Sequence, residues 1–115
     1  MDRRIANAIE LIQNDTYHRL EVSDLARRVN LSSGRFGHLF REETSLSPKE
    51  YARQWRLARA KELLDGTFLK VNEIAARVGF RHVSSFTRDF KSHYGLPPSK
   101  SRGQITVRQP GLGEN

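Results

Sequence analysis

One stretch of this sequence places basic and hydroxyl side chains three and four residues apart. Ser84, Thr87, Arg88 and Lys91 fall on one side of a helix with a period of about 3.6 residues, and phenylalanines fall on the other side. A guanidinium group donates two parallel hydrogen bonds, an ammonium group neutralises an anion, and a hydroxyl group donates or accepts. These side chains therefore suit the binding of an anionic surface that also offers hydrogen-bonding groups.

The stretch is part of an internal repeat, whose earlier copy has the same phenylalanine spacing. Val22 matches Val71 at an offset of 49, and after one extra residue in the second copy Phe36 matches Phe86 at an offset of 50. A repeat of this length indicates a duplicated supersecondary unit.

Each copy is predicted to be a pair of short helices joined by a tight turn. Asn30 and Gly79 take equivalent places in the turn, and these two residue types most readily adopt a left-handed conformation. The second helix of each pair carries phenylalanines on one face and polar or basic residues on the other, which is typical of a helix-turn-helix. The apolar spacing predicts helices at residues 3–14, 21–29, 33–44 (capped by Ser32 or Ser33), 47–65, 71–78 and 83–94, and a last short turn at 97–102.

The longest predicted helix, residues 47–65, joins the two copies. Ser47 can cap its first turn, and Gly66 follows its last turn as a stop. At 1.5 Å per residue the helix is roughly 27 Å long. Its apolar stripe is expected to contain Tyr51, Trp55, Leu57, Ala58, Ala60 and Leu64.

The charge of the chain favours a polyanionic partner. Its 115 residues contain 20 lysines and arginines against 13 acidic residues, which gives a formal net charge of +7 and an isoelectric point near 10.4. No cysteine is present, which excludes disulfides and thiolate zinc sites and is typical of the reducing cytoplasm. We expect no secretory signal and no membrane span, because no apolar run is long enough. Nucleic acid is the partner that this composition favours, and the cytoplasm is the expected compartment.

The residues that could catalyse a reaction do not support an enzyme. The four histidines lack the spacing of a metal site, and Glu42 and Glu43 are neighbours that point in different directions. No glycine loop precedes a helix in the manner of a phosphate-binding loop. We therefore predict no catalytic residue, no metal and no cofactor.

The two copies carry the motifs of a known family. Residues 25–64, LARRVNLSSGRFGHLFREETSLSPKEYARQWRLARAKELL, followed by residues 71–102, VNEIAARVGFRHVSSFTRDFKSHYGLPPSKSR, resemble the DNA-binding domain of the AraC/XylS family of bacterial transcription regulators. The resemblance covers about residues 5–102. Its most specific residues are Ile74, Ala75, Gly79, Phe80, Phe86, Arg88, Phe90, Lys91, Gly95 and Pro98.

The resemblance implies an all-α fold of seven helices, in which the long helix bridges two homeodomain-like helix-turn-helix subdomains. It also implies that the second helix of each pair enters the major groove of double-stranded DNA, in two successive grooves. The implied function is sequence-specific transcription regulation, with activation as the expected direction and RNA polymerase as a second partner. The segment is expected to be a monomer without a small-molecule ligand, or dimeric through a separate domain if it belongs to a longer protein.

Groove chemistry assigns roles to residues on the second helix of each pair. Arg88 can bind guanine through two hydrogen bonds, and Ser84 and Thr87 can hydrogen-bond to a base or touch a thymine methyl group. Gly34 and Gly37 leave the first of these helices bare, so either its backbone approaches DNA closely or it contacts few bases. The candidates for base reading are Arg35, His38, Ser84, Thr87 and Arg88, and those for phosphate contact are Ser33, Arg41, Arg81, His82 and Lys91.

The expected domain organisation follows the repeat. Residues 1–46 form the first helix-turn-helix subdomain, residues 47–66 the linking helix, residues 67–102 the second subdomain and residues 103–115 a disordered tail. A different class of function is a protein-interaction module that contacts RNA polymerase or another regulator and has lost DNA binding. The bare glycines favour this alternative, and DNA binding without salt dependence, or no DNA binding, would distinguish it.

Overall fold

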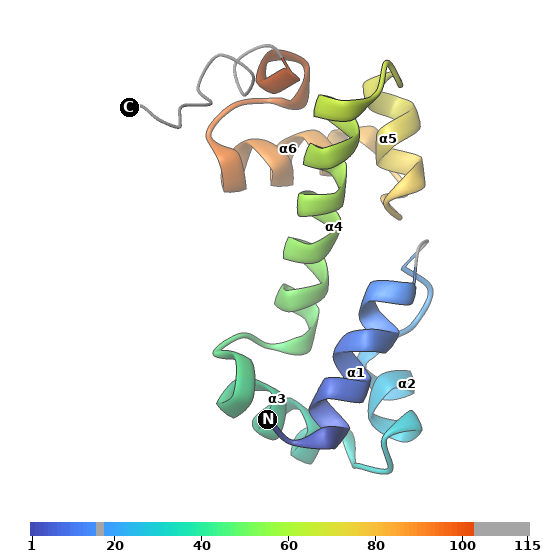
Figure 1. The fold of residues 1–115 in the computed structure, drawn as a ribbon, viewed down its shortest axis with the longest axis vertical. Helices are drawn as coiled ribbons and strands as arrows, with labels where there is room; N and C mark the ends of the chain where they lie inside the picture. The colour runs from blue at the N-terminus through green and yellow to red at the C-terminus, as the bar shows by residue number, and fades with distance from the viewer. Residues whose placement is uncertain (16–17, 103–115) are drawn as a thin grey trace. The chain divides into compact units, whose positions relative to one another are not determined.

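All regular secondary structure in the described part of the chain is helical. The computed structural model describes residues 1–15 and 18–102, and these ranges contain seven helical segments and no strand (Figure 1). This confirms the all-α, seven-helix fold, while the expected tail at residues 103–115 lies outside the described residues. The helices are α1 (Arg3–Asn14), α2 (Val22–Arg28), α3 (Ser33–Thr44), α4 (Pro48–Gly66), α5 (Val71–Arg77), α6 (Val83–Tyr94) and a short helix at 98–102.

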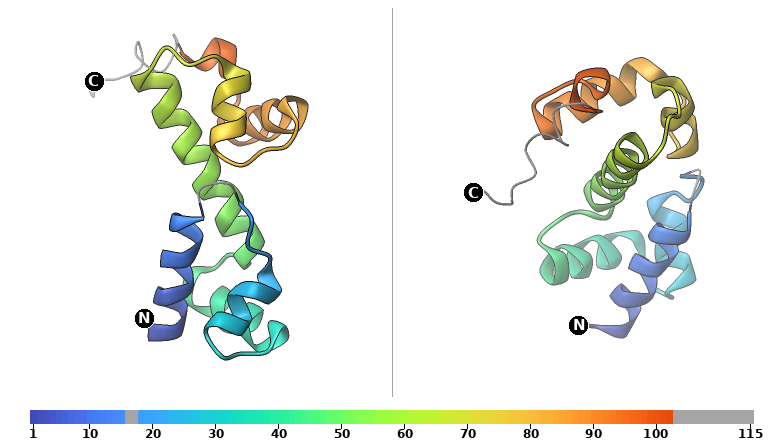
Figure 2. Two further views of the ribbon diagram at one scale, coloured as in Figure 1. Left: turned by 90° about the vertical axis from the view of Figure 1, so that its right-hand side faces the viewer. Right: turned by 45° about the horizontal axis from the view of Figure 1, so that its top comes forward.

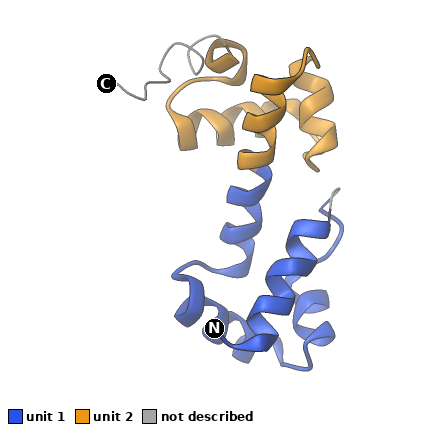
Figure 3. Ribbon diagram, in the orientation of Figure 1, with its two compact units in different colours: residues 1–56 blue, residues 57–115 orange. Residues whose placement is uncertain are grey.

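The chain divides into two units, unit 1 (Met1–Arg56) and unit 2 (Leu57–Asn115), which are coloured separately in Figure 3. The boundary falls inside α4, so this helix contributes residues to both units. Within unit 1, α1 packs against both α2 and α3, and within unit 2, α5 packs against α6 (Figure 2). The subdomain boundaries given above stay a prediction.

Unit 1 has a core built around α3. Phe36 and Phe40 are fully buried, and their rings meet edge to face with centroids 5.6 Å apart. The Phe40 ring also meets the ring of Tyr51 from α4, at 5.4 Å between centroids. Because two phenylalanines one turn apart are buried, the opposite side of α3 has to face outward. The buried members of this core are Ile5, Ala8, Ile12, Leu25, Ala26, Val29, Phe36, Phe40 and Ala52.

Unit 2 repeats this arrangement around α6. Phe86 and Phe90, which the repeat matches to Phe36 and Phe40, are fully buried with centroids 5.7 Å apart. The phenylalanines therefore belong to the core of each unit, as their spacing predicted. The buried members of the second core are Leu57, Ala60, Leu64, Ile74, Ala75, Val78, Phe86 and Phe90.

Equivalent left-handed turns connect the two helices of each pair, as predicted. Asn30 has a φ of 62° and Gly79 a φ of 93°. At the next position of the first copy, the backbone N–H of Leu31 donates to the Ala26 carbonyl at 2.9 Å. In the second copy, the backbone N–H of Phe80 donates to the Ala75 carbonyl, also at 2.9 Å. This geometry ends the first helix and redirects the chain into the second.

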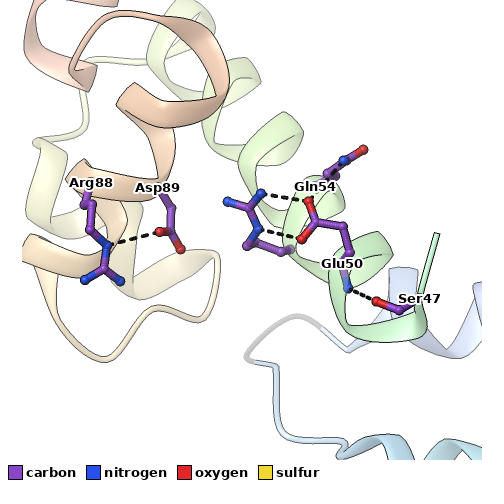
Figure 4. Close-up of polar contacts among 6 residues, drawn as sticks. Ser47, Glu50, Gln54, Arg88 and Asp89 are labelled. Atoms are coloured by element: carbon purple, nitrogen blue, oxygen red, sulfur yellow. Dashed lines mark hydrogen bonds and ion pairs between the residues drawn. The ribbon is translucent and has the colours of Figure 1, made fainter.

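The N-terminus of α4 is capped as predicted, whereas its C-terminus is not formed as predicted. The backbone N–H of Glu50 donates to the Ser47 hydroxyl oxygen at 3.1 Å, which satisfies a free donor of the first turn (Figure 4). Gly66 was predicted to follow the helix as its stop, but it is the last helical residue. The helix ends where Thr67 donates both its backbone N–H and its hydroxyl group to the Leu63 carbonyl, at 3.1 and 2.6 Å.

The apolar stripe predicted along α4 is also wrong at one position. Ala58 is exposed, whereas Ala52, which lay outside the predicted stripe, is buried. The physical reason is that α4 serves two cores, with Ala52 in the core of unit 1 and Leu57 and Leu64 in that of unit 2. A single helical stripe cannot describe apolar positions that serve two cores.

The short helix at 98–102 is fastened to unit 2 by Arg102. Its guanidinium donates from Nε to the Leu64 carbonyl at 2.9 Å and from Nη2 to the Leu69 carbonyl at 2.6 Å. A charged donor makes these bonds stronger than those between neutral groups. They join the last described helix to the end of α4 and the segment that follows it.

Candidate nucleic-acid interface

The residues predicted to bind DNA lie on or directly before α3 and α6, which we call the recognition helices. α3 begins where the Ser32 hydroxyl oxygen accepts the backbone N–H of Arg35 at 3.2 Å, so Ser32 rather than Ser33 is its cap. It ends at Ser45, which is left-handed with a φ of 68°. Both ends of the helix are therefore fixed by local interactions.

The predicted face of α3 points away from the core of unit 1. Phe36 and Phe40 occupy the buried side, and the predicted interface residues lie outside it. Gly37 is partly exposed, and the other five are exposed. The six residues are Ser33, Gly34, Arg35, Gly37, His38 and Arg41.

The predicted face of α6 points away from the core of unit 2 in the same way. His82 is the residue before the helix, and its side chain makes no capping hydrogen bond. Arg81 and His82 are exposed directly before the first turn. On the helix, Thr87 is partly exposed, and Ser84, Arg88 and Lys91 are exposed. The structure thus brings the second set of candidates together on one helix, as their spacing predicted.

Arg88 is available to an external partner. Its side chain is 74% exposed, and its Nε lies 3.4 Å from an Asp89 carboxylate oxygen (Figure 4). A contact of this length in water contributes little free energy, because solvent screens exposed charge pairs and the distance is long for a hydrogen bond. The guanidinium can therefore exchange this contact for a better acceptor.

His38 has a partner that the sequence analysis missed. Its Nε2 lies 3.3 Å from a carboxylate oxygen of Glu42, one turn further along α3. The available signal was the spacing of four residues, which places two helical side chains on the same side. An acidic group thus lies beside a residue assigned to base reading.

The two glycines of α3 are not required by the packing of unit 1. A Cβ atom built on Gly34 or Gly37 would have no atom within 4 Å beyond its chain neighbours and the backbone of its own helix. Neither residue has a positive φ, so neither needs the conformational freedom of glycine. The bare surface at these positions is therefore a property of the exposed face and not a demand of the fold.

This observation predicts that Gly37→Ala stabilises the protein. Alanine in a helix interior is favoured over glycine by about 1 kcal/mol, and the structure has room for the added methyl group. Urea denaturation measures the change in the free energy of unfolding. Gly95→Ala is the matched control, because its site is equally open but has a φ of 87°, so this change should destabilise. A lower stability of Gly37→Ala would show that the glycine is needed by the fold.

Other classes of site receive no support from the described residues. Within residues 1–15 and 18–102, no group of three or more acidic, histidine or cysteine side chains could hold a metal ion. None of the helices described in the structure has the length and apolar character needed to cross a membrane.

Comparisons with known proteins show the family of this chain. Residues 25–104 match the family model described as a helix-turn-helix domain. The Msm operon regulatory protein of Streptococcus mutans is 38% identical over 100 residues, which are 86% of this chain and 36% of that protein. The lactose operon transcription activator of Staphylococcus xylosus is 27% identical over 103 residues, which are 90% of this chain and 37% of that protein. This chain therefore spans little more than a third of the length of these relatives.

The fold is similar to that of a domain solved together with DNA. The crystal structure of the DNA-binding domain of AdpA, a global transcriptional factor, in complex with a target DNA superimposes with a TM-score of 0.85 at 26% identity. The match covers 93% of this chain and 96% of that domain. Proteins of this kind are DNA-binding domains and not enzymes. The chain belongs to the helix-turn-helix family of the AraC/XylS type, the DNA-binding domains of bacterial transcription regulators.

Proposed function

We propose that the chain binds double-stranded DNA sequence-specifically by inserting α3 and α6 into two successive major grooves. The observation that carries this proposal is the duplicated recognition helix. In each copy, two fully buried phenylalanines hold one side of the helix in a core, and the opposite side exposes polar and basic groups. A helix presented in this way fits the width of the major groove.

The side chains of α6 can supply direct base contacts. Arg88 can donate two hydrogen bonds to the O6 and N7 atoms of guanine, and Ser84 and Thr87 can hydrogen-bond to base edges. On α3, Arg35 and His38 take the equivalent role. The residues assigned to phosphates are Ser33, Arg41, Arg81, His82 and Lys91.

The biological role that we propose is regulation of bacterial transcription in the cytoplasm, with activation as the direction. The names of the two relatives support it, since one is an operon regulatory protein and the other a transcription activator. RNA polymerase is the second partner that activation requires. In this proposal the segment binds DNA as a monomer.

The direct test is selection of bound sequences from a random duplex library about 30 base pairs long, which exceeds two helical turns of DNA. The selected duplex is then titrated with the protein at several salt concentrations to measure its affinity. Enrichment of one asymmetric site, with affinity that falls as salt rises, supports the proposal. Failure to enrich any sequence would favour the alternative, a protein-interaction module whose bare α3 face serves another protein.

Lys91→Ala is expected to weaken binding to all sequences alike. A lysine at a phosphate supplies charge but no base discrimination, so its loss should lower the slope of log affinity against log salt by about 1. Arg59→Ala is a suitable control, because it removes one cation from α4 that already pairs with Glu62 at 2.8 Å. An unchanged slope in Lys91→Ala would remove this residue from the phosphate contacts.

A further inference from the structure

The recognition helices have the same scaffold but expose different side chains. The offset of 50 places Phe36 with Phe86 and Phe40 with Phe90, and all four are fully buried. Both helices contain 12 residues and end in a left-handed residue. The two exposed faces can therefore be compared position by position.

The face of α6 carries more groups that can contact bases. At three matched exposed or partly exposed positions, α6 has two hydroxyl groups and a guanidinium, whereas α3 has two glycines and an imidazole. At a fourth matched pair the difference is reversed, because α3 has Arg35 and α6 has Ser85. The first position of α6 also adds Val83, which is 43% exposed and lies outside the core of unit 2. The matched pairs are Gly34 with Ser84, Gly37 with Thr87 and His38 with Arg88.

The packing of unit 1 does not explain why α3 has glycine at positions 34 and 37. A Cβ atom at position 34 or 37 would meet no atom within 4 Å beyond its chain neighbours and the backbone of its own helix, and neither position has a positive φ. A side chain could therefore begin at either position without its Cβ atom meeting the core. The absence of side chains there removes two positions from which a helix in the major groove could read bases.

The charges of the two helices also favour DNA contacts by α6 over those by α3. α3 carries two arginines and two glutamates, whereas α6 carries an arginine and a lysine against one aspartate. Glu42 is 61% exposed beside His38, and the second copy has Ser92 at that place. A carboxylate on this face repels phosphates, and it also competes with DNA for the imidazole.

From these differences we infer that α6 sets most of the sequence specificity and that α3 discriminates few bases, with Glu42 lowering its affinity for DNA. This inference rests on the proposed function, since it divides the reading of DNA between the two recognition helices. The DNA site should therefore contain one strongly discriminated block and one weakly discriminated block.

The first test substitutes each base pair of the selected site in turn and measures the affinity of the full chain. We expect losses of about tenfold or more at the positions of one block and of less than about threefold in the other, because each good bidentate contact gives discrimination of this size. Two equally discriminated blocks would overturn the inference but leave the proposed function intact. No selected site at all would instead reject the proposed function.

The repeat offers a second test by exchange of the two faces. The variant Gly34→Ser, Arg35→Ser, Gly37→Thr, His38→Arg and Glu42→Ser gives α3 the groups that α6 has at these five positions. It should convert the weak block to the base preference of the strong block. The reciprocal variant, Ser84→Gly, Ser85→Arg, Thr87→Gly, Arg88→His and Ser92→Glu, should lose most of the discrimination. A folded first variant whose weak block is unchanged would overturn the inference; folding is checked by circular dichroism.

The role of Glu42 is tested by a single change that leaves the shape of the side chain intact. Glu42→Gln should tighten binding several-fold for all sequences, since one repulsive charge is removed. Glu10→Gln is the matched control, because Glu10 is an exposed glutamate of the same unit on α1. Equal effects of the two variants, or no effect of Glu42→Gln, would remove Glu42 from the inference.

Discussion

Arg88→Ala is expected to cost about 1 to 3 kcal/mol of binding free energy for the preferred DNA site and to relax discrimination at one base pair. The guanidinium is exposed, its contact with Asp89 is weak, and Phe86 and Phe90 fix the side of α6 that carries it. A truncated side chain leaves the two acceptors of a guanine without their donors. Equilibrium titration against all four base pairs at each position of the selected site measures the effect.

Arg88→Lys separates the charge of this residue from its hydrogen-bonding geometry. A lysine keeps the attraction to DNA but cannot donate two parallel hydrogen bonds in a plane. We therefore expect this variant to retain most of the affinity for non-specific DNA and still to lose discrimination at the same base pair. If Arg88→Ala weakened every sequence by the same factor, the residue would be a phosphate contact and not a base reader.

The features of the fold that could be predicted from the sequence are those decided within one or two turns of chain. The turn at Asn30 and Gly79 is an example, because the left-handed conformation restricts the residue type. The four core phenylalanines are another, because burial of one helix face produces a spacing of three or four residues. The sides of α3 and α6 that face outward follow directly from these residues.

Features that depend on more than one element were predicted less well. Ala58 was assigned to the wrong side of α4, because the sequence alone did not show that one helix serves two cores. Gly66 was assigned as a stop because its type suits one, but it is the last residue of the helix, and Thr67 follows it with its hydroxyl group bonded to the Leu63 carbonyl. The bonds from Arg102 to the carbonyls of Leu64 and Leu69 join residues more than 30 positions apart, which no local pattern reveals.

The candidate interface also contains features that were predicted from the sequence and features that were not. The membership of α6 in it followed from side-chain spacing, and the structure exposes or partly exposes all its proposed contact residues. The contact between His38 and Glu42 was not predicted, although residues four positions apart share one side of a helix. Which bases each residue contacts depends on the DNA, so these assignments remain proposals.

Phe90→Ala is expected to produce the largest loss of stability, about 3 to 5 kcal/mol for unit 2. Phe90 is fully buried, and its ring contacts Phe86 and Tyr94 with centroids 5.7 and 4.6 Å away. Removing the ring leaves a cavity and loses the apolar surface that holds α6 in place. Since small domains are stable by only about 5 to 15 kcal/mol, much of the stability of unit 2 should be lost. Amide hydrogen exchange measures this loss residue by residue.

The repeat supplies the control, because Phe40→Ala removes the equivalent ring from the core of unit 1. Phe90→Ala should reduce protection mainly in α5 and α6, and Phe40→Ala mainly in α1, α2 and α3. Equal loss of protection in both units for either variant would contradict their separate cores. The DNA binding of the two variants can then be compared, because each variant removes the core contacts that hold one recognition helix in place. If α6 carries most of the specificity, Phe90→Ala should abolish discrimination between sequences, whereas Phe40→Ala should lower affinity and keep the preference for the strong block.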